Sequence, residues 1–425
     1  KRSLTEKVPL LLKFQPLGEA ESSPRVWIQI ISLESERDAQ GFETGNFVEG
    51  ETLALEDVST GRLETALGTG FYILRVEAPG FQEMNVPIQI RPEEVRGSIK
   101  GKSPLDKTLQ LIPEEWVPQG GKLIHPTTGL IGHNWYVDGD VVTANSFPMR
   151  PYEIKKPLAV SEKPVTVQEY KEFIEDLLRE NNEQNGENGA EFKKRLAEIQ
   201  SYLPRTNIEP EARGRLGQAF NRALQKKNYY WEIERPRVWG GLMRDNVANL
   251  VNPLSHPDPF GDPILADQPI TAITYLAAEA YLRWRSERDG KNYRMPTVEE
   301  MEVFSRNSFD WRFPWGNGPL MPNYVVSRGA FENLDDVSPQ PVGKHPLGPS
   351  RDRSLYEIVD LLGNTREYAS VRGLEGNAAL FGGSVRMLFG SNFKPSARYL
   401  THVNQVLDSG GSFRWVLDLT EPPSE

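Results

Sequence analysis

The chain has 425 residues, of which 38% are hydrophobic and 25% are charged, and its formal net charge is −10. These proportions are typical of a globular protein, and the length predicts two or three structural units at about 150 residues each. The acidic balance argues against a nucleic-acid partner, because proteins that bind phosphate backbones present clustered Lys and Arg on a basic face.

The chain contains no cysteine. This excludes disulfides, thiolate nucleophiles and Cys-ligated metals, but it leaves the compartment open. No apolar run approaches the roughly 18 residues that span a bilayer. Because the first residue is Lys1 and not Met, we expect a mature or trimmed chain whose signal, anchor or preceding domain has been removed.

The N-terminal quarter is dominated by short runs of β-branched and aromatic residues. They predict strands at residues 7–14, 25–31, 52–58, 63–67, 71–76 and 85–90. No helix pattern occurs before Asp106. The first 104 residues are therefore predicted to form a small β-sandwich, and the polar stretch 91–107 to connect it to the rest.

A first helix is predicted from Val165 onward, because apolar residues recur there at helical spacing. Residues 181–265 are expected to be an insertion. Its Asn-rich start has no apolar side chain to bury, which predicts an exposed and mobile loop. Two helix-like patterns follow within it, at 192–203 and 216–224.

The stretch 267–315 carries the clearest local signals. Its apolar residues predict an amphipathic helix that ends at Asp289-Gly290, followed by a short strand at 292–295. Thr297 lies three residues before Glu300, which is the spacing of a capping box and predicts the start of a second helix. Beyond the aromatic cluster that ends at Trp315, the chain is predicted to be rich in loops.

A family resemblance rests on motifs in this half of the chain. Residues 294–302, RMPTVEEME, look like a signature of the formylglycine-generating-enzyme, or sulfatase-modifying-factor, family, in particular its catalytically degenerate members associated with bacterial Ser/Thr kinases. Further matches appear in the family's order: KPVTVQEY at 163–170, PWGN at 314–317, PVG at 341–343, LGNTREY at 362–368, FGGS at 381–384 and SFR at 412–414.

The resemblance implies an α+β, C-type-lectin-like fold over residues 105–425, preceded by the all-β sandwich. Residues 69–90 are similar to PEGA-type modules found beside such domains. An immunoglobulin-like spacer is the alternative for this sandwich.

The family's oxidase activity, as the resemblance implies it, uses copper held by two cysteines that follow the GGS motif. The aligned positions here are Met387 and Asn392, and neither supplies a thiolate. A related branch uses iron held by three histidines. The five histidines of this chain are widely spaced, and no pair has the HxxxH spacing that places two imidazoles on one helix face. We therefore predict a protein that is not an enzyme.

No cofactor is predicted, and structural calcium is the one inorganic candidate that stays open. The resemblance implies Asn and Asp side chains as hard oxygen ligands, at Asn323 with Asp335 or Asp336, and at Asn364. The alternative is that these residues are ordinary turn residues. Arg366, Arg398 and Arg414 are predicted to form buried ion pairs or backbone hydrogen bonds that hold the loops.

The function that we predict is a non-catalytic ligand- or protein-binding module, the sensor or interaction region of a larger bacterial protein such as a receptor-type Ser/Thr kinase. Its location would be periplasmic or extracellular, with the cytoplasm not excluded. Recognition residues sit on loops over a rigid base. The aromatic side chains of the loops define the predicted ligand surface: Trp311, Trp315, Tyr324, Phe331, Tyr368, Phe389, Phe393 and Tyr399.

Three alternatives stay open. One is a hypervariable display protein of a diversity-generating system, and another is a structural component of an envelope complex that forms oligomers. The third is an oxidase-like enzyme with an unrecognised site.

Overall fold

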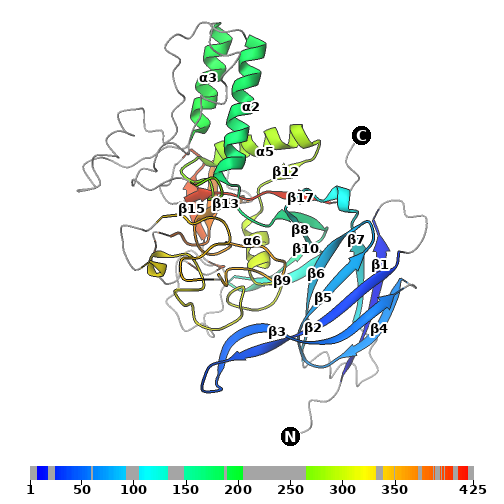
Figure 1. The fold of residues 1–425 in the computed structure, drawn as a ribbon. Coiled ribbons are helices and arrows are strands. Elements are labelled where there is room, and N and C mark those ends of the chain that lie inside the picture. The colour runs from blue at the N-terminus through cyan, green and yellow to red at the C-terminus, as the bar shows by residue number, and fades with distance from the viewer. Residues whose placement is uncertain are drawn as a thin grey trace.

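The structure is a computed structural model, and it describes residues 7–17, 24–58, 61–91, 105–132, 148–185, 189–203, 265–331, 338–348, 350–371, 376–385, 387, 393, 395–396, 398–404 and 410–419. The elements form an all-β unit and an α+β unit that pack on each other (Figure 1). Within the described residues, no helix is long and apolar enough to cross a membrane.

The N-terminal unit is a sandwich of two sheets, as the sequence predicts. Its strands are β1 (Val8–Pro16), β2 (Val26–Arg37), β3 (Glu43–Val58), β4 (Arg62–Leu67), β5 (Gly70–Ala78), β6 (Phe81–Ile90) and β7 (Leu105–Leu111). One sheet has the order β4-β1-β7 and the other β3-β2-β5-β6. Alternating apolar residues such as Leu10, Leu12, Ile28 and Ile30 fill the space between the sheets, each at most 1% exposed.

Strand β7 belongs to the N-terminal unit, although the predicted boundary at residue 104 placed it in the second unit. It pairs in parallel with β1, from Leu10 opposite Leu105 to Pro16 opposite Leu111. The stretch that we expected to open the second unit therefore completes the first sheet, and the second unit starts after β7.

The second unit contains small sheets, antiparallel except for the parallel pair β13 and β16, and four described helices. The strands are β8 (Gly121–Ile124), β9 (Thr127–Ile131), β10 (Arg150–Ile154), β11 (Leu158–Ser161), β12 (Tyr293–Arg294), β13 (Arg366–Ala369), β14 (Asn377–Phe381), β15 (Arg398–His402), β16 (Gly410–Ser412) and β17 (Val416–Asp418). The helices are α2 (Val167–Asn185), α3 (Ala190–Tyr202), α5 (Tyr275–Asp289) and α6 (Val298–Ser305), with 3-10 turns at Glu114–Trp116 and Arg328–Ala330.

Two four-stranded sheets organise this unit, with the orders β12-β17-β11-β8 and β15-β14-β13-β16. Helix α5 packs beside the first, and α2 and α3 form a hairpin that projects from the body (Figure 1). The local signals are confirmed: Thr297 and Glu300 form a capping box at α6, and Gly290 ends α5 in the left-handed conformation.

The start of the insertion differs from the prediction. Helix α2 continues to Asn185, and Asn181 is 2% exposed instead of lying in an exposed loop. Its side-chain Nδ2 donates a hydrogen bond to the carbonyl oxygen of Phe192 in α3 at 3.3 Å. A polar residue is buried there because it hydrogen-bonds the neighbouring helix, an interaction that composition alone does not reveal. The second helix-like pattern, at 216–224, lies outside the described residues.

The two units are joined by a contact between backbones. The amide of Phe47 in β3 donates to the carbonyl of Trp315 at 2.8 Å, and the amide of Asn317 donates to the carbonyl of Gly45 at 2.7 Å. Such close approach requires glycine. A Cβ on Gly316 would lie 2.8 Å from the carbonyl oxygen of Gly45, and one on Gly318 would lie 2.7 Å from that of Thr44.

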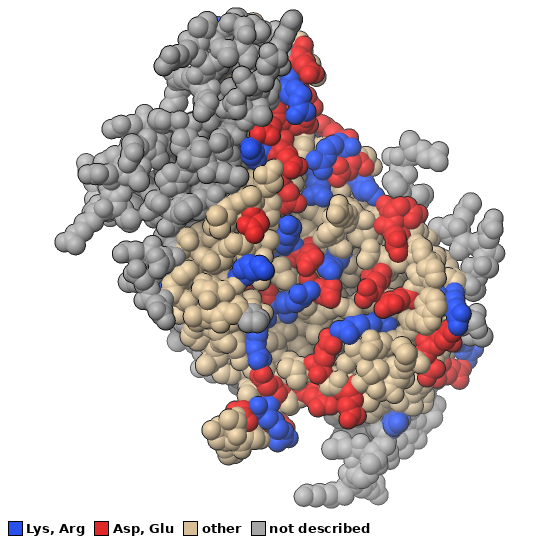
Figure 2. All heavy atoms as spheres, viewed as in Figure 1, with Lys and Arg blue, Asp and Glu red and all other residues tan. Residues whose placement is uncertain are grey.

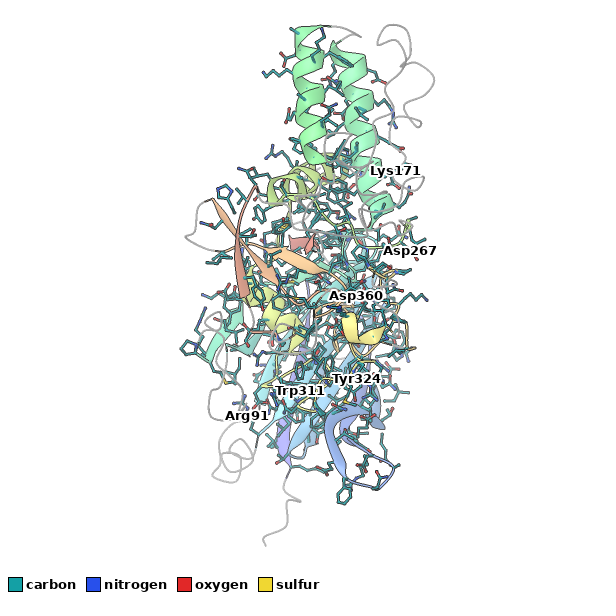
Figure 3. All side chains as sticks on the ribbon, turned by 90° about the vertical axis from the view of Figure 1, so that its left-hand side faces the viewer. Arg91, Lys171, Asp267, Trp311, Tyr324 and Asp360 are labelled. Carbon is teal, nitrogen blue, oxygen red and sulfur yellow. The ribbon has the colours of Figure 1, made fainter. Side chains whose placement is uncertain are left out.

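Side chains extend this junction on both sides. Trp311 stacks on Phe47 with ring centroids 4.8 Å apart, and Asn46 donates from Nδ2 to the hydroxyl of Tyr324 at 2.9 Å. Arg351 forms a bidentate ion pair with Glu36 of β2, with Nη1 and Oε2 3.0 Å apart. This guanidinium lowers the pKa of Glu36 to about 2. Trp311 and Tyr324 lie just above the N-terminal strands in Figure 3.

We expect Gly316→Ala to lower the free energy of unfolding by about 2 to 3 kcal/mol, because the added methyl group meets a backbone atom of the other unit. Gly348→Ala is the matched control. Both glycines have positive φ, 125° and 117°, but a Cβ on Gly348 has no atom within 4 Å. Denaturant titration measures both variants, and equal losses would show that backbone strain, and not the contact between units, is responsible.

Candidate functional site

A buried ion pair holds the centre of the second unit together. Glu367 in β13 and Arg414 are 1% and 0% exposed, and Nε of Arg414 lies 2.7 Å from Oε2 of Glu367. The same guanidinium donates to backbone carbonyls, including that of Val359 at 3.0 Å. The predicted role of Arg414 is confirmed. A fixed, planar set of donors lets one side chain tie several loops to a strand.

Two further buried carboxylates lie near this pair. Oδ2 of Asp352 accepts from the amides of Leu362 and Gly363 at 2.8 and 2.7 Å. Oδ2 of Asp360 accepts from the amide of Gly343 at 2.9 Å. Burial, together with the charge of Asp360, raises the pKa of Asp352 to about 7, and burial raises the pKa of Asp360 to about 6. Oδ1 of Asp352 has no hydrogen-bond partner among the described residues.

The position aligned with the family's first cysteine has a different environment. Nη2 of Arg366 lies 3.1 Å from Sδ of Met387, and the guanidinium stacks over the ring of Tyr399 with its carbon 4.0 Å from the centroid. Burial lowers the pKa of Arg366 from its ordinary value. The thioether thus contacts a cation that is itself stacked on an aromatic ring.

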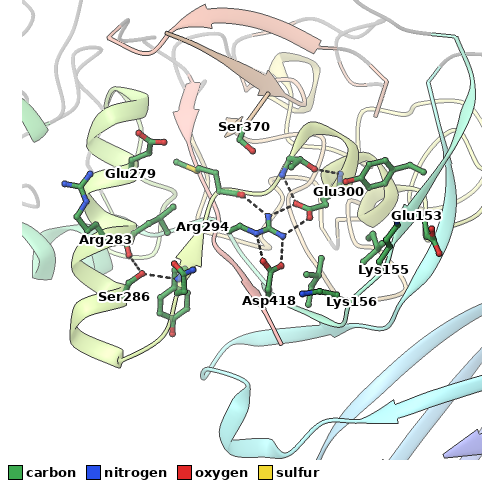
Figure 4. Close-up of a pocket in the computed structure, with 18 of the residues that line it drawn as sticks. Glu153, Lys155, Lys156, Glu279, Arg283, Ser286, Arg294, Glu300, Ser370 and Asp418 are labelled. Carbon is green, nitrogen blue, oxygen red and sulfur yellow. Dashed lines mark hydrogen bonds and ion pairs between the residues drawn. The ribbon is translucent and has the colours of Figure 1, made fainter. Parts of the chain in front are cut away.

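A large cavity lies elsewhere, between α5 and the β10–β11 connection. It has a volume of about 1080 Å³ and is open to solvent. Arg294 of β12 occupies its floor (Figure 4). Each of the five N–H donors of Arg294 is used, by Glu300, by Asp418 and by the carbonyl of Met295. The guanidinium of Arg294 therefore has no free donor, and its single positive charge faces two carboxylates, those of Glu300 and Asp418.

The walls of the cavity carry further charged side chains, most of which are more exposed than Arg294 on its floor. Lys155 and Lys156 come from the β10–β11 connection, and Glu279 and Arg283 from one face of α5 (Figure 4). Both lysines and Arg283 are exposed. Figure 2 shows the same mixture on a larger scale, with acidic and basic side chains interspersed and no continuous basic area on the face that it displays. The cavity suits a polar ligand with charges of both signs.

The predicted aromatic ligand surface is wrong for most of its members. Five of the predicted side chains are buried in the core: Trp311, Trp315, Tyr324, Tyr368 and Phe393, each 8% exposed or less. The first three hold the junction between the units, and Tyr368 donates to the carbonyl of Ile273. Phe331 and Tyr399 are half-buried and do not line the described cavity, and Phe389 lies outside the described residues.

The residues proposed for calcium are not brought together as a described site. Asn323 is exposed, and Asp335 and Asp336 lie outside the described residues. Asn364 is buried, and its Oδ1 accepts from the amide of Gln340 at 2.9 Å while its Nδ2 donates to the carbonyl of Gln340 and to Asp360. In the described part of the chain, Asn364 holds the loop at Gln340 by hydrogen bonds. Calcium at these positions stays a prediction.

The described histidines are engaged in backbone hydrogen bonds. Nε2 of His125 accepts from the amide of Gln110 at 2.9 Å, and Nδ1 lies 3.0 Å from the carbonyl of Pro126. Burial lowers the pKa of His125 to about 4. His345 and His402 each accept a backbone amide, and no group of three or more His, Asp or Glu side chains within the described ranges could hold a metal.

A family model for the sulfatase-modifying factor enzyme 1-like domain matches residues 110–406. The chain belongs to this family. Its α+β fold and the order of its motifs agree with that membership.

Individual relatives match more locally. Hercynine oxygenase from Mycolicibacterium smegmatis is 31% identical over 156 residues, which cover 32% of this chain and 32% of that protein. The chain thus spans about a third of the length of this curated relative. Two solved structures are similar over 70% of this chain: PvdO from Pseudomonas aeruginosa, with 93% of its own chain covered, 16% identity and a TM-score of 0.42, and Treponema denticola variable protein 1, with 94%, 15% and 0.32.

The residues present do not fit the copper site of the family. The first cysteine position is Met387, whose sulfur contacts a guanidinium, and the chain has no cysteine anywhere. The second position, Asn392, lies outside the described residues. A cation next to the sulfur opposes the binding of a metal cation, and a single thioether is a weak ligand.

Several residues of these sites were not singled out from the sequence. Asp352 and Asp418 gave no signal, because single aspartates in loop-rich or C-terminal segments resemble ordinary turn residues. The adjacent Lys155 and Lys156 follow a strand-like run, and that position at a strand end was the one available hint for the cavity wall.

We expect the free energy of unfolding to fall as pH rises from about 4 to 7, because the pKa of Asp352 is about 7 in the folded state against an ordinary 3.8. The folded state binds the proton more tightly, so its contribution is complete below pH 3.8 and is lost as pH approaches 7. Asp352→Asn keeps an oxygen for the two amides and removes the titration.

The variant should therefore be less sensitive to pH between 4 and 7, and at pH 8 more stable than the natural chain by about 1 to 3 kcal/mol. Urea titration across this range measures the effect. Asp310→Asn, at an exposed position, is the control and should leave the pH profile unchanged. An unaltered slope for Asp352→Asn would contradict the assignment.

Proposed function

We propose that the protein is a non-catalytic binding module. The observation that carries this proposal is the contact between Arg366 and Met387, 3.1 Å from nitrogen to sulfur, at the position where the family's oxidase places a copper-binding thiolate. Arg366 is also stacked on Tyr399. Because an arginine side chain does not lose its proton in a protein, this cation is permanent and cannot give way to a metal by titration.

The cavity of about 1080 Å³ is the proposed ligand site. Because all five N–H donors of Arg294 on the floor are used, this residue has none left for a ligand. Specificity would therefore come from the side chains on the walls. Lys155 and Lys156 would bind an anionic group of the ligand from one side of the cavity. Glu279 and Arg283 of α5 contribute one negative and one positive charge on the other side. A peptide or another ligand with charges of both signs complements this arrangement better than a polyanion does.

The wider role that we propose is the sensor or interaction region of a larger bacterial protein, at a periplasmic or extracellular location. Support comes from the resemblance of residues 112–121, IPEEWVPQGG, to the opening of kinase-associated members of the family. The rival function is an oxygen-dependent enzyme, and the local similarity to hercynine oxygenase is what favours it.

We expect no catalysed oxygen consumption when the protein is supplied with Cu(I) and a cysteine-containing peptide, because the thiolates that would hold copper are missing. An oxygen electrode and a copper-binding titration measure this. Parallel reactions with Fe(II), hercynine and a thiol test the rival enzyme. Turnover in either reaction that depends on the protein would overturn the proposal.

We expect the double variant Lys155→Glu/Lys156→Glu to weaken binding of peptides that carry both Lys and Glu by about tenfold or more, since it reverses one wall of the cavity. Isothermal titration with a panel of such peptides measures the affinities. Lys193→Glu/Lys194→Glu, at exposed positions of α3, is the control with the same change in net charge. Equal affinities for the natural chain and the double variant would exclude this wall as the ligand site.

A further inference from the structure

Strand β3 forms one edge of the sheet β3-β2-β5-β6 and is mostly exposed. Large apolar side chains lie on it in the open: Val48 is 42% exposed, Leu53 is 49% exposed and Leu55 is 75% exposed. An exposed edge strand is a template for pairing with another chain. The position of β3 is marked in Figure 1.

The first part of this edge already pairs with another segment of the chain. Asn46 and Gly316 form an antiparallel bridge, through the hydrogen bonds of Phe47 with Trp315 and of Asn317 with Gly45. Beyond Phe47, residues 48–57 continue along the same edge with no further backbone partner on that side among the described residues. The edge thus stays open beyond Phe47, and its pairing with β2 is regular from Ala54 to Val58, with register shifts between Ala54 and Glu49.

The charge of β3 has one sign. The strand reads ETGNFVEGETLALEDV, with five acidic residues and no Lys or Arg. Glu49 is paired with Arg75 and Asp57 with Arg25, both from neighbouring parts of the sheet. Glu51 and Glu56 have no ion-pair partner in the described part of the structure. A cationic segment beside this edge would therefore meet carboxylates that are not yet neutralised.

We propose that residues 48–57 of β3 bind an extended, basic segment of a partner protein, which adds to the sheet as an antiparallel strand. Backbone hydrogen bonds would supply affinity. Apolar side chains of the added strand would contact Leu53 and Leu55 on one face, and Lys or Arg on the other face would meet Glu56, while Glu51 adds negative charge at the same edge. A second copy of this chain is a poor occupant, because two acidic strands would repel each other. This site is separate from the cavity and does not depend on the ligand proposed there.

The experiment uses the full chain and a synthetic ten-residue peptide of alternating Lys and Val. We expect binding by fluorescence anisotropy, and slower hydrogen exchange of the amides in residues 48–57 on addition of peptide. The control peptide has the same sequence with alternate amides N-methylated, which keeps its charge and removes its backbone donors. It should bind at least about tenfold more weakly.

The variant Glu51→Lys/Glu56→Lys should weaken binding of the unmodified peptide by about tenfold or more, whereas Glu115→Lys/Glu287→Lys, with the same change in net charge at exposed positions away from the edge, should leave it within about twofold. Equal binding of the N-methylated peptide would overturn strand addition. So would an absence of protection in residues 48–57, or a concentration-dependent dimer that forms through β3.

Discussion

The close approach of two backbones, residues 44–47 of β3 and residues 315–318, is the constraint on which the arrangement of the units depends. Three glycines make it possible: Gly45 and Gly316 have positive φ, and a side chain on Gly318 would meet Asn46 at once. Where the backbones are in contact, Trp311 and Tyr324 are buried and Phe47 is half-buried. Trp311 and Phe47 stack, and Tyr324 accepts from Asn46. The junction is therefore part of the core.

This constraint explains where prediction from the sequence succeeded and where it failed. The capping box at Thr297, the glycine that ends α5 and the apolar face of α2 are local patterns, and each was correct because the responsible residues lie within one or two turns. The burial of Tyr324 depends on a residue 278 positions away. A run of aromatic loop residues is compatible with a binding surface and with an interface between domains, and spacing does not distinguish them.

The polar centre shows the same division. Arg414 was predicted to hold loops through ion pairs or carbonyls, because a guanidinium in a motif near a strand has few other stable uses when buried. The carboxylates of Asp352 and Asp360 were not predicted as a buried group. Their burial follows from backbone amides of residues 343, 362 and 363 that converge on them only in the folded chain. Amide donors partly offset the desolvation of a carboxylate, but here burial and mutual repulsion exceed that offset, so their pKa values are raised.

The fate of the position aligned with the copper-binding cysteine follows from how side chains share space. In place of a thiolate, which attracts cations, the chain has a thioether in contact with a guanidinium that is itself stacked on an aromatic ring. The guanidinium of Arg366 contacts the aromatic face of Tyr399 and the sulfur of Met387, and neither contact requires a metal. A cysteine introduced at residue 387 alone would still face Arg366. The same scaffold keeps long loops and a large cavity with walls of mixed charge. A guanidinium beside a thioether at this position, together with an open recess lined by charges of both signs, is what the binding role proposed above rests on.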